Sequence, residues 1–461
     1  MISQFNSEGN TMSGKFKTFP QPEKEKIRST LSENMAISLS ALTRYAIYTV
    51  LIFTPLARGS VQDWAVSVIH IVTLTALTAF LLERSLTWKW KRIKTPLDKP
   101  IFALLILVIL STIFSMHFRT SFQALMLFVN YIVIFYLVIH TTRTRSQFRQ
   151  LIYIIIGMAT FLSFFGFLKL FGISPFPWWN YTDLSQNSHR LASTFGNPDH
   201  LAGYMEMALP LILGLFLKDY KGGRLFVMIC LTILMLAALI LSLSRGGWIG
   251  SVISLTFMSL VLLTNRYFRH KGFLISVTVG LLAAALIVLS STPVVERFRT
   301  IPEQKEMTVH GRVTVWKGVI KMIDSNPFTG SGPGTFATVF TQYQPPGLKN
   351  HFRMAHNDYL HFISEVGYPL VPVIIWMMII FYRRVFKKLR HRSRLVRGIS
   401  LGAMSGVTAI LIHSIGDFNL HIPSNALLFS VLAALVMSRD PNLRSRHKSR
   451  VSCQKIMLTR P

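Results

Sequence analysis

Residues 225–264 read LFVMICLTILMLAALILSLSRGGWIGSVISLTFMSLVLLT, and this stretch decides the fold class. Apolar residues fill most of it, and Arg245 is its one charged residue. A helix needs about 20 mainly apolar residues to cross the hydrocarbon of a bilayer, so the stretch has room for two crossings. The sequence SLSRGG at residues 242–247 predicts a tight turn between them, which places Arg245 at a membrane surface.

Similar apolar stretches recur on both sides of this pair. Hydrophobic residues make up 51% of the 461 residues and the mean hydropathy is +0.43. This composition predicts an all-α polytopic membrane protein rather than a large soluble core. About twelve stretches approach the length of a membrane-spanning helix: 36–57, 62–82, 100–116, 120–140, 150–172, 199–217, 225–243, 247–264, 272–290, 359–382, 398–415 and 423–438.

The sequence shows no internal repeat and no boundary of a soluble domain. Residues 1–35 are polar and predict a disordered cytoplasmic tail, followed by a membrane domain over 36–438. A long polar loop at 291–358, between the ninth and tenth apolar stretches, predicts an external subdomain, and 439–461 form a second, basic cytoplasmic tail. Cys230 and Cys453 would then fall in different compartments, so no disulfide is expected.

The basic residues behind the net charge of +30 are concentrated in the connections on one side of the membrane. With a cytoplasmic N-terminus, most Lys and Arg residues fall in the inner connections, as in WKWKR at 88–92 and RRVFKK at 383–388. This is the positive-inside pattern, and it accounts for the charge without nucleic-acid binding. Some of these side chains are expected to contact anionic lipid headgroups. Both termini are predicted to lie inside.

Because the chain crosses the membrane with each span, alternate loops lie on the same side. This helix parity places the unusual polar residues on the side opposite the basic connections. The loops predicted to share that outer side are 58–61, 117–119, 173–198, the turn at 244–245, 291–358 and 416–422.

Within the long loop, residues 311–324 have the periodicity of an amphipathic helix that lies along the membrane surface. Its predicted apolar face consists of Val313, Trp316, Val319, Ile320 and Ile323. Proline at 327 disfavours helix at the residue before it, so the helix is expected to end there.

Three arginines on the predicted outer side are candidates for binding an anion. Arg245 and Arg312 would either extend to lipid headgroups or bind a phosphate through the planar guanidinium fork. A pyrophosphate lies at headgroup depth and needs more than one donor, so two such arginines on one side favour phosphate binding. Arg190 is a further candidate.

Histidine and carboxylate residues gather at two outer helix ends. His356 precedes Asn357 and Asp358, either of which fits a helix N-cap, and a histidine at this depth is either structural or a general base. His413 and Asp417 form a polar pair that costs stability at a helix end unless it is used or satisfied.

Neither a nucleotide site nor a tight metal site is predicted. The run Gly330–Gly334 lacks the Gly-Lys-Ser/Thr ending of a P-loop. No HExxH motif, cysteine cluster or Asp-x-Asp pair is present, although weak metal binding by histidine stays open.

Taken in order, the motifs resemble those of the O-antigen ligase family, bacterial membrane glycosyltransferases related to O-antigen polymerases. The resemblance covers about residues 40–438 and depends on the order of the motifs. They are GNPDHLAGY at 196–204, SRGGW at 244–248, Gly311-Arg312 with Trp316, NPFTGSGPG at 326–334 and HNDYL at 356–360.

The resemblance implies a GT-C-like enzyme of the bacterial inner membrane with a periplasmic site. Its donor would be a glycan on undecaprenyl pyrophosphate, its acceptor a glycan, lipid or protein, and no cofactor or metal would be needed. Matched by motif, Arg245 and Arg312 would contact the pyrophosphate and His356 would be catalytic. The residues that would complete the substrate site are Arg190, Asp358, His413 and Asp417.

A direct attack by the acceptor hydroxyl would invert the anomeric carbon. A retaining route would need a carboxylate nucleophile, for which Asp358 and Asp417 are the candidates. Two other functions stay open. A lipid-linked-sugar transporter would scatter ionisable residues near the bilayer midplane, whereas here they gather at outer helix ends. A polymerase of O-antigen, capsule or exopolysaccharide would share every motif.

Overall fold

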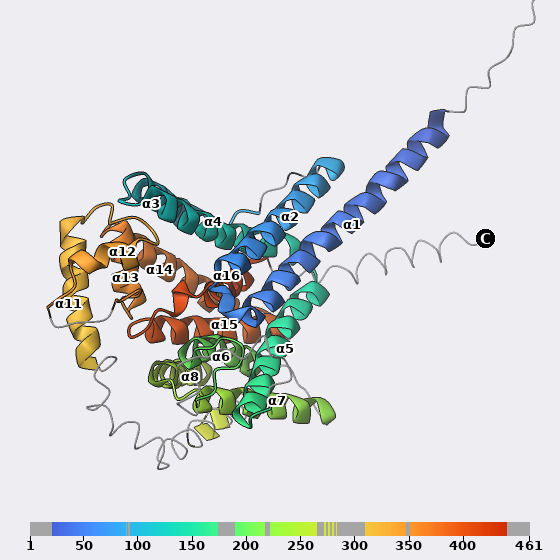
Figure 1. Ribbon diagram of the computed structural model, residues 1–461. Coiled ribbons are helices and arrows are strands. Elements are labelled where there is room, and N and C mark those ends of the chain that lie inside the picture. The colour runs from blue at the N-terminus through green and yellow to red at the C-terminus, as the bar shows by residue number, and fades with distance from the viewer. Residues whose placement is uncertain are drawn as a thin grey trace, which may run out of the picture.

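The computed structural model is all-α over the residues that it describes, which are 21–88, 93–173, 190–216, 222–264, 309–346 and 351–439, with single residues at 90 and between 272 and 283. Figure 1 shows the helices packed side by side, with α11, α12 and α13 grouped at one end of the molecule. The described helices are α1 (Gln21–Leu56), α2 (Asp63–Thr87), α3 (Asp98–Ile113), α4 (Phe118–Thr141), α5 (Arg145–Leu170), α6 (Pro198–Leu215), α7 (Gly223–Leu241), α8 (Arg245–Thr264), α11 (Val309–Ser325), α12 (Phe336–Val339), α13 (Asp358–Val366), α14 (Leu370–Lys388), α15 (Arg394–His413) and α16 (Pro423–Met437), with short 3-10 turns η1 (Arg58–Ser60), η3 (Phe340–Gln342) and η4 (Asn419–His421).

The chain is a multi-pass membrane protein. Among the described residues, seven helices are long and apolar enough to cross a bilayer, which confirms the predicted class. They are Ser32–Leu56, Asp63–Thr87, Phe118–Thr141, Arg145–Leu170, Gly223–Leu241, Arg245–Thr264 and Arg394–His413. The larger predicted number of spans stays a prediction, and most of the predicted span 272–290 lies outside the described residues.

Several predicted helix boundaries agree with the structure, while the first helix begins earlier. The break at 242–247 is confirmed, since α7 ends at Leu241 and α8 begins at Arg245. Helix α1 begins at Gln21 and therefore includes part of the predicted tail, of which residues 1–20 lie outside the description. Pro22 and Glu23 in its first turn suit a helix N-terminus.

The predicted span 359–382 is wrong as one helix, because the chain breaks between α13 and α14. Gly367 ends α13 with φ of +91°, in the region where residues with a side chain are strained. Its missing side chain also leaves room for the backbone of residues 327 and 328, which a Cβ atom would approach to 2.6–2.8 Å. Nine residues are too few to cross a membrane, so α13 belongs with the loop that precedes it.

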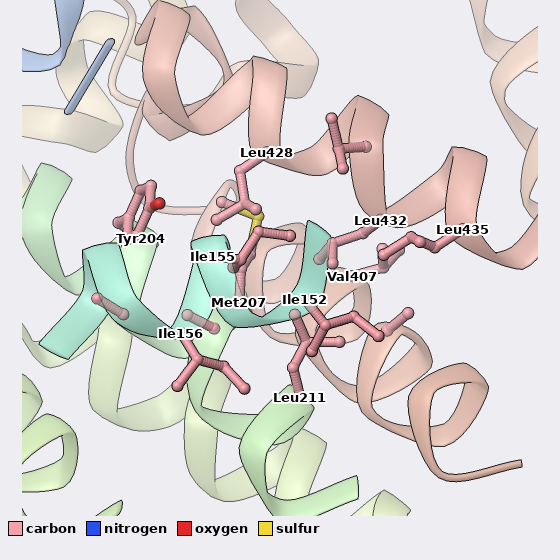
Figure 2. Close-up of a cluster of buried hydrophobic side chains, with 14 of the residues drawn as sticks. Ile152, Ile155, Ile156, Tyr204, Met207, Leu211, Val407, Leu428, Leu432 and Leu435 are labelled. Atoms are coloured by element: carbon pink, nitrogen blue, oxygen red, sulfur yellow. The ribbon is translucent and has the colours of Figure 1, made fainter. Parts of the chain in front are cut away.

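The buried centre of the molecule is formed by helices far apart in the sequence. Ile152, Ile155 and Ile156 of α5 face Tyr204, Met207 and Leu211 of α6, with side chains of α15 and α16 on the other side (Figure 2). Helix α6 also packs along α15, and α15 packs against α8. These contacts hold α6, α8, α15 and α16 close to one another.

The helix predicted at 311–324 is confirmed as α11, and it ends at Ser325 as expected. Its predicted apolar face was partly wrong. Val313 and Ile320 are exposed, whereas the face buried against α12 and α13 includes Val315, Val319 and Met322. The error came from centring the face on Trp316, which lies at the edge of the buried stripe and is only half-buried.

The described parts of the predicted outer loops meet at one end of the molecule. The hydroxyl group of Thr194 donates to the carbonyl oxygen of Pro55 at 2.7 Å, which joins loop 190–197 to the end of α1. The backbone of Met116 donates to the carbonyl oxygen of Ser331 at 3.1 Å, which joins the α3–α4 turn to the glycine-rich segment. These contacts join loops that the sequence assigns to one side of the membrane, and the side itself stays a prediction.

Candidate active site

His356 lies at the entrance to α13, against the loop between α15 and α16. Asn357 caps the helix by accepting a hydrogen bond from the backbone of Leu360 at 3.0 Å, as one of the two predicted alternatives requires. His356 itself has φ of +49°, an uncommon value for a residue with a side chain. Strained backbone of this kind often accompanies a functional residue.

Asp417 faces the His356 ring. Its Oδ1 atom lies 3.6 Å from Nδ1 of His356, and the ring of Phe418 meets the His356 ring edge-on at 5.0 Å between centroids. Burial by itself would raise the pKa of the Asp417 carboxyl, but His356 and His413 together hold that pKa well below its usual range. A charged carboxylate beside an imidazole stabilises the protonated ring.

Asp358 fastens α13 to the same loop. One carboxylate oxygen accepts from the Ser414 hydroxyl at 2.7 Å and from the backbone of Leu420 at 2.9 Å, and the other lies 2.5 Å from Nδ1 of His421. The residue is buried. The Asp358 carboxylate thereby fixes the distance between His356 and Asp417, because it joins the two segments that carry them.

Arg312 reaches this loop from α11. Its Nη1 atom donates to the carbonyl oxygen of Gly416 at 2.5 Å, next to Asp417, while its buried Nε has no hydrogen-bond partner among the described residues. One turn along α11, the indole of Trp316 donates to the carbonyl oxygen of Ala355 at 3.0 Å. The same helix therefore holds an arginine near the His356–Asp417 pair and supports the backbone that carries His356.

Arg245 begins α8 directly after the tight turn. Within the described part of the chain it makes no hydrogen bond or ion pair, but Arg312, Arg190 and Asp199 are close enough to act on its charge. Three arginines near one aspartate leave excess positive charge at this end of the bundle. Such a cluster is suited to a ligand with more than one negative charge.

Arg190 braces the turn that presents Arg245. It donates from Nε to the carbonyl oxygen of Ser242 at 2.9 Å and pairs through Nη2 with Asp199 at 2.7 Å. The contacts join three segments, namely loop 190–197, the first turn of α6 and the turn before α8.

His413 lies deeper, at the end of α15, and is buried. Its Nδ1 atom lies 3.0 Å from a carboxylate oxygen of Glu206, and its Nε2 atom lies 3.7 Å from Asp417. The structure therefore brings the predicted pair His413 and Asp417 together and adds a carboxylate from α6 to it.

A separate cluster contains the best metal-ligand geometry among the described residues. His361, Glu365 and His421 offer one ligand atom each within 4.8 Å of one another. The contacts are those of two acid–histidine pairs, since Glu365 lies 3.2 Å from His361 and Asp358 holds His421. The backbone of Ala355 points at Nδ1 of His361 at 3.4 Å, which favours a proton on Nε2 toward Glu365 and disfavours Nε2 as a ligand.

The glycine-rich segment is a packed turn. Backbone N–H groups of Ser331 and Gly332 donate to carbonyl oxygens of Ser364 and Glu365 at 3.0 Å. These donors are used inside the protein, so the turn is not a phosphate cradle.

Sequence reasoning missed Glu206 and His421. Glu206 is the one acidic residue within the apolar stretch 200–217, and an ionisable group at such a position is itself a signal of function. His421 lies four residues after Asp417 and could have been found only from its contact with Asp358.

A family model described as O-Antigen ligase matches residues 230–375. The chain carries an O-antigen ligase domain. This confirms the resemblance drawn from the motifs, and members of the family are membrane enzymes that transfer lipid-linked glycans. The O-antigen ligase domain contains Arg245, Arg312 and His356, whereas Asp417, His413, Arg190 and Glu206 lie outside the matched residues. Comparison with curated proteins gives no match.

Proposed function

We propose that this protein transfers a glycan from undecaprenyl pyrophosphate to a hydroxyl group of an acceptor, in a single inverting displacement. The observation that carries the proposal is the cluster of Arg245, Arg312 and Arg190 beside the His356–Asp417 pair. The cluster supplies charge for a pyrophosphate leaving group, and the pair supplies a base. The O-antigen ligase domain supports the same donor class.

The arginines would bind and neutralise the pyrophosphate. Charge grows on the oxygen that leaves the anomeric carbon, so fixed positive charge stabilises the transition state more than the ground state. Arg245 is the better placed of the two, because it has no competing partner among the described residues, whereas Arg312 already donates to Gly416. The Nε atom of Arg312 has no hydrogen-bond partner among the described residues, but it is buried, so it would donate to a ligand only after the side chain moves.

His356 would remove the proton from the acceptor hydroxyl. The acceptor oxygen forms a bond to the anomeric carbon, the bond from that carbon to the pyrophosphate oxygen breaks, and the proton stays on His356. Asp417 would stabilise the resulting imidazolium. The products are the glycosylated acceptor and undecaprenyl pyrophosphate.

The contacts of the two candidate nucleophiles favour this inverting route. Both oxygens of Asp358 bind inside the protein, and both oxygens of Asp417 face histidine rings. Neither carboxylate has an oxygen free of protein contacts, as a covalent intermediate would need. Arg190, Asp358, His413 and Asp417, which the sequence predicts to bind substrate, are therefore proposed to position Arg245 and His356.

We place the site at the periplasmic face of the bacterial inner membrane, with both termini in the cytoplasm. The positive-inside distribution of charge and the gathering of the polar loops at one end support this orientation.

Polymerisation of a lipid-linked surface glycan is the second candidate, and the same site would serve it. The test uses purified protein in nanodiscs with undecaprenyl-pyrophosphate glycan, first alone and then with lipid A core or another acceptor. Product on the added acceptor supports ligation, while longer lipid-linked chains without it support polymerisation. Movement of the donor across the membrane with no new glycosidic bond would instead support transport and overturn the proposal.

A further inference from the structure

Glu206 is a carboxylate buried inside the membrane domain. It lies two turns into α6, and its side chain is completely covered by protein. A carboxylate at such a position is costly unless it has a partner or a function. Its Oε1 atom lies 3.0 Å from Nδ1 of His413, and its Oε2 has no hydrogen-bond partner among the described residues.

From His413 a line of polar contacts continues to the proposed base. The Nε2 atom of His413 lies 3.7 Å from one oxygen of Asp417, whose other oxygen lies 3.6 Å from His356. Asn419 steadies the same Nε2 atom at 3.2 Å. Glu206, His413, Asp417 and His356 therefore form one line that runs from the packed interior of the bundle to the outer end.

Helix α8 makes room for this line. A Cβ atom at Gly246 would collide with the imidazole ring of His413, and one at Gly250 would lie 3.1 Å from Oε2 of Glu206. The two glycines are four residues apart and therefore share a face of α8. The backbone of α8 thus comes close to both polar groups at the point where they meet.

We propose that Glu206 is a positioning residue for the transfer reaction, acting on His356 through His413 and Asp417. The nearer carboxylate, Glu206, fixes the His413 ring through Nδ1 and would balance the charge of the ring in its protonated form. The negative charge of Asp417 is then available to stabilise a protonated His356. With Glu206 neutral, Asp417 would be the one charged carboxylate beside His413 among the described residues. It would then interact with both histidines and stabilise a protonated His356 less. This inference rests on the proposed function.

The decisive variant is Glu206→Gln, which keeps the size of the side chain and an acceptor for Nδ1 of His413 while removing the charge. We expect kcat to fall by about tenfold or more, a part of the roughly 10²–10⁴ that a general base contributes. The affinity for undecaprenyl-pyrophosphate glycan should not change. Glu206→Asp retains the charge and should keep more activity than Glu206→Gln.

The matched control is Tyr204→Phe. Tyr204 lies half a turn earlier in α6, is fully buried, and its hydroxyl group has no hydrogen-bond partner among the described residues. This variant removes a buried polar atom from the same helix and should leave kcat unchanged. Normal kcat in Glu206→Gln, or a loss that appears as weaker donor binding, would overturn the inference.

A double variant separates positioning from general damage to the fold. If Glu206 acts through Asp417, Glu206→Gln combined with Asp417→Asn should be no slower than Asp417→Asn alone. Multiplied losses would mean independent effects and would overturn the inference. If Glu206→Gln does not accumulate, His413→Gln interrupts the same line and is tested in the same way. Absence of transfer by the wild-type protein would overturn the proposed function itself, which is a distinct result.

Discussion

The Nδ1 atom of His356 lies 3.6 Å from Oδ1 of Asp417, although the two residues come from separate segments of the chain. Asp358 holds those segments together through the Ser414 hydroxyl and the backbone of Leu420. The distance between His356 and Asp417 thus depends on the buried contacts of Asp358 beside them. The role of this pair can be tested separately from the arginines that would bind the donor.

We expect His356→Ala to reduce transfer by about 10²–10⁴, the usual contribution of a general base, because the variant removes the imidazole that would accept the proton. Binding of the lipid-linked donor should be nearly normal. Asp417→Asn should cause a smaller loss, since the base is kept and only its carboxylate partner is removed. Single-turnover rates and donor binding, measured separately in nanodiscs, check both variants. Weak donor binding as the sole defect of His356→Ala would contradict its role as a base.

Variants of the two arginines are expected to bind the donor more weakly. Arg245→Ala and Arg312→Ala should each lower donor affinity and transfer, while the protein still accumulates in the membrane. Lysine should restore only part of the loss, because it keeps the charge and lacks the planar fork. Lys321→Ala is the control, as an exposed basic residue on the same helix as Arg312. Full activity in both alanine variants would exclude the pyrophosphate contacts.

Transfer is expected to survive EDTA. Asp358 and Glu365 already pair with Nδ1 of His421 and Nε2 of His361, so among the described residues only the buried Nε2 atom of His421 in this cluster lacks a hydrogen-bond partner, and one histidine nitrogen is too few to hold a metal tightly. The measurement is activity after chelation and dialysis, with elemental analysis of the purified protein. Loss of activity that returns with one added metal would assign a metal to this cluster, and His421→Ala should then lose the metal.

Cysteine labelling should report the orientation. With Cys230 and Cys453 replaced by serine, a cysteine at Lys321 should react with an impermeant maleimide from the periplasmic side. A cysteine at Arg390, exposed at the end that follows α14, should react only after the cytoplasm is opened. The reverse pattern would place the His356 site in the cytoplasm and exclude a periplasmic donor.

Much of the fold follows from the sequence because membrane helices are specified locally. Length and apolarity place α2, α4, α5, α7 and α8 close to their predicted ranges. The break between α13 and α14 was missed because the residues around Gly367 and Pro369 are apolar enough to continue a span. Gly367 followed by Pro369 is a local stop signal that the apolar pattern outweighed, whereas the close approach of residues 327 and 328 to Gly367 is a tertiary contact that the sequence does not report.

In the candidate site, too, the sequence predicted what depends on helix order and missed what depends on tertiary contacts. Helix parity brought Arg245, Arg312 and His356 to one end of the molecule because it needs only the order of the helices. Parity cannot give the roles of Arg190 and Asp358, whose side chains are used in contacts with Ser242 and Ser414. Those contacts depend on how far each loop folds over its neighbour, so the sequence indicated charged residues at the site without indicating which ones are free to act.

The close approach of α8 to His413 predicts that positions 246 and 413 are coupled in evolution. A side chain at Gly246 would occupy the space of the His413 ring, so neither position can change freely while the other stays as it is. In related sequences, glycine at the first position and histidine at the second should be kept or lost together. A relative with alanine there and histidine retained would have to carry its α8 farther from α15.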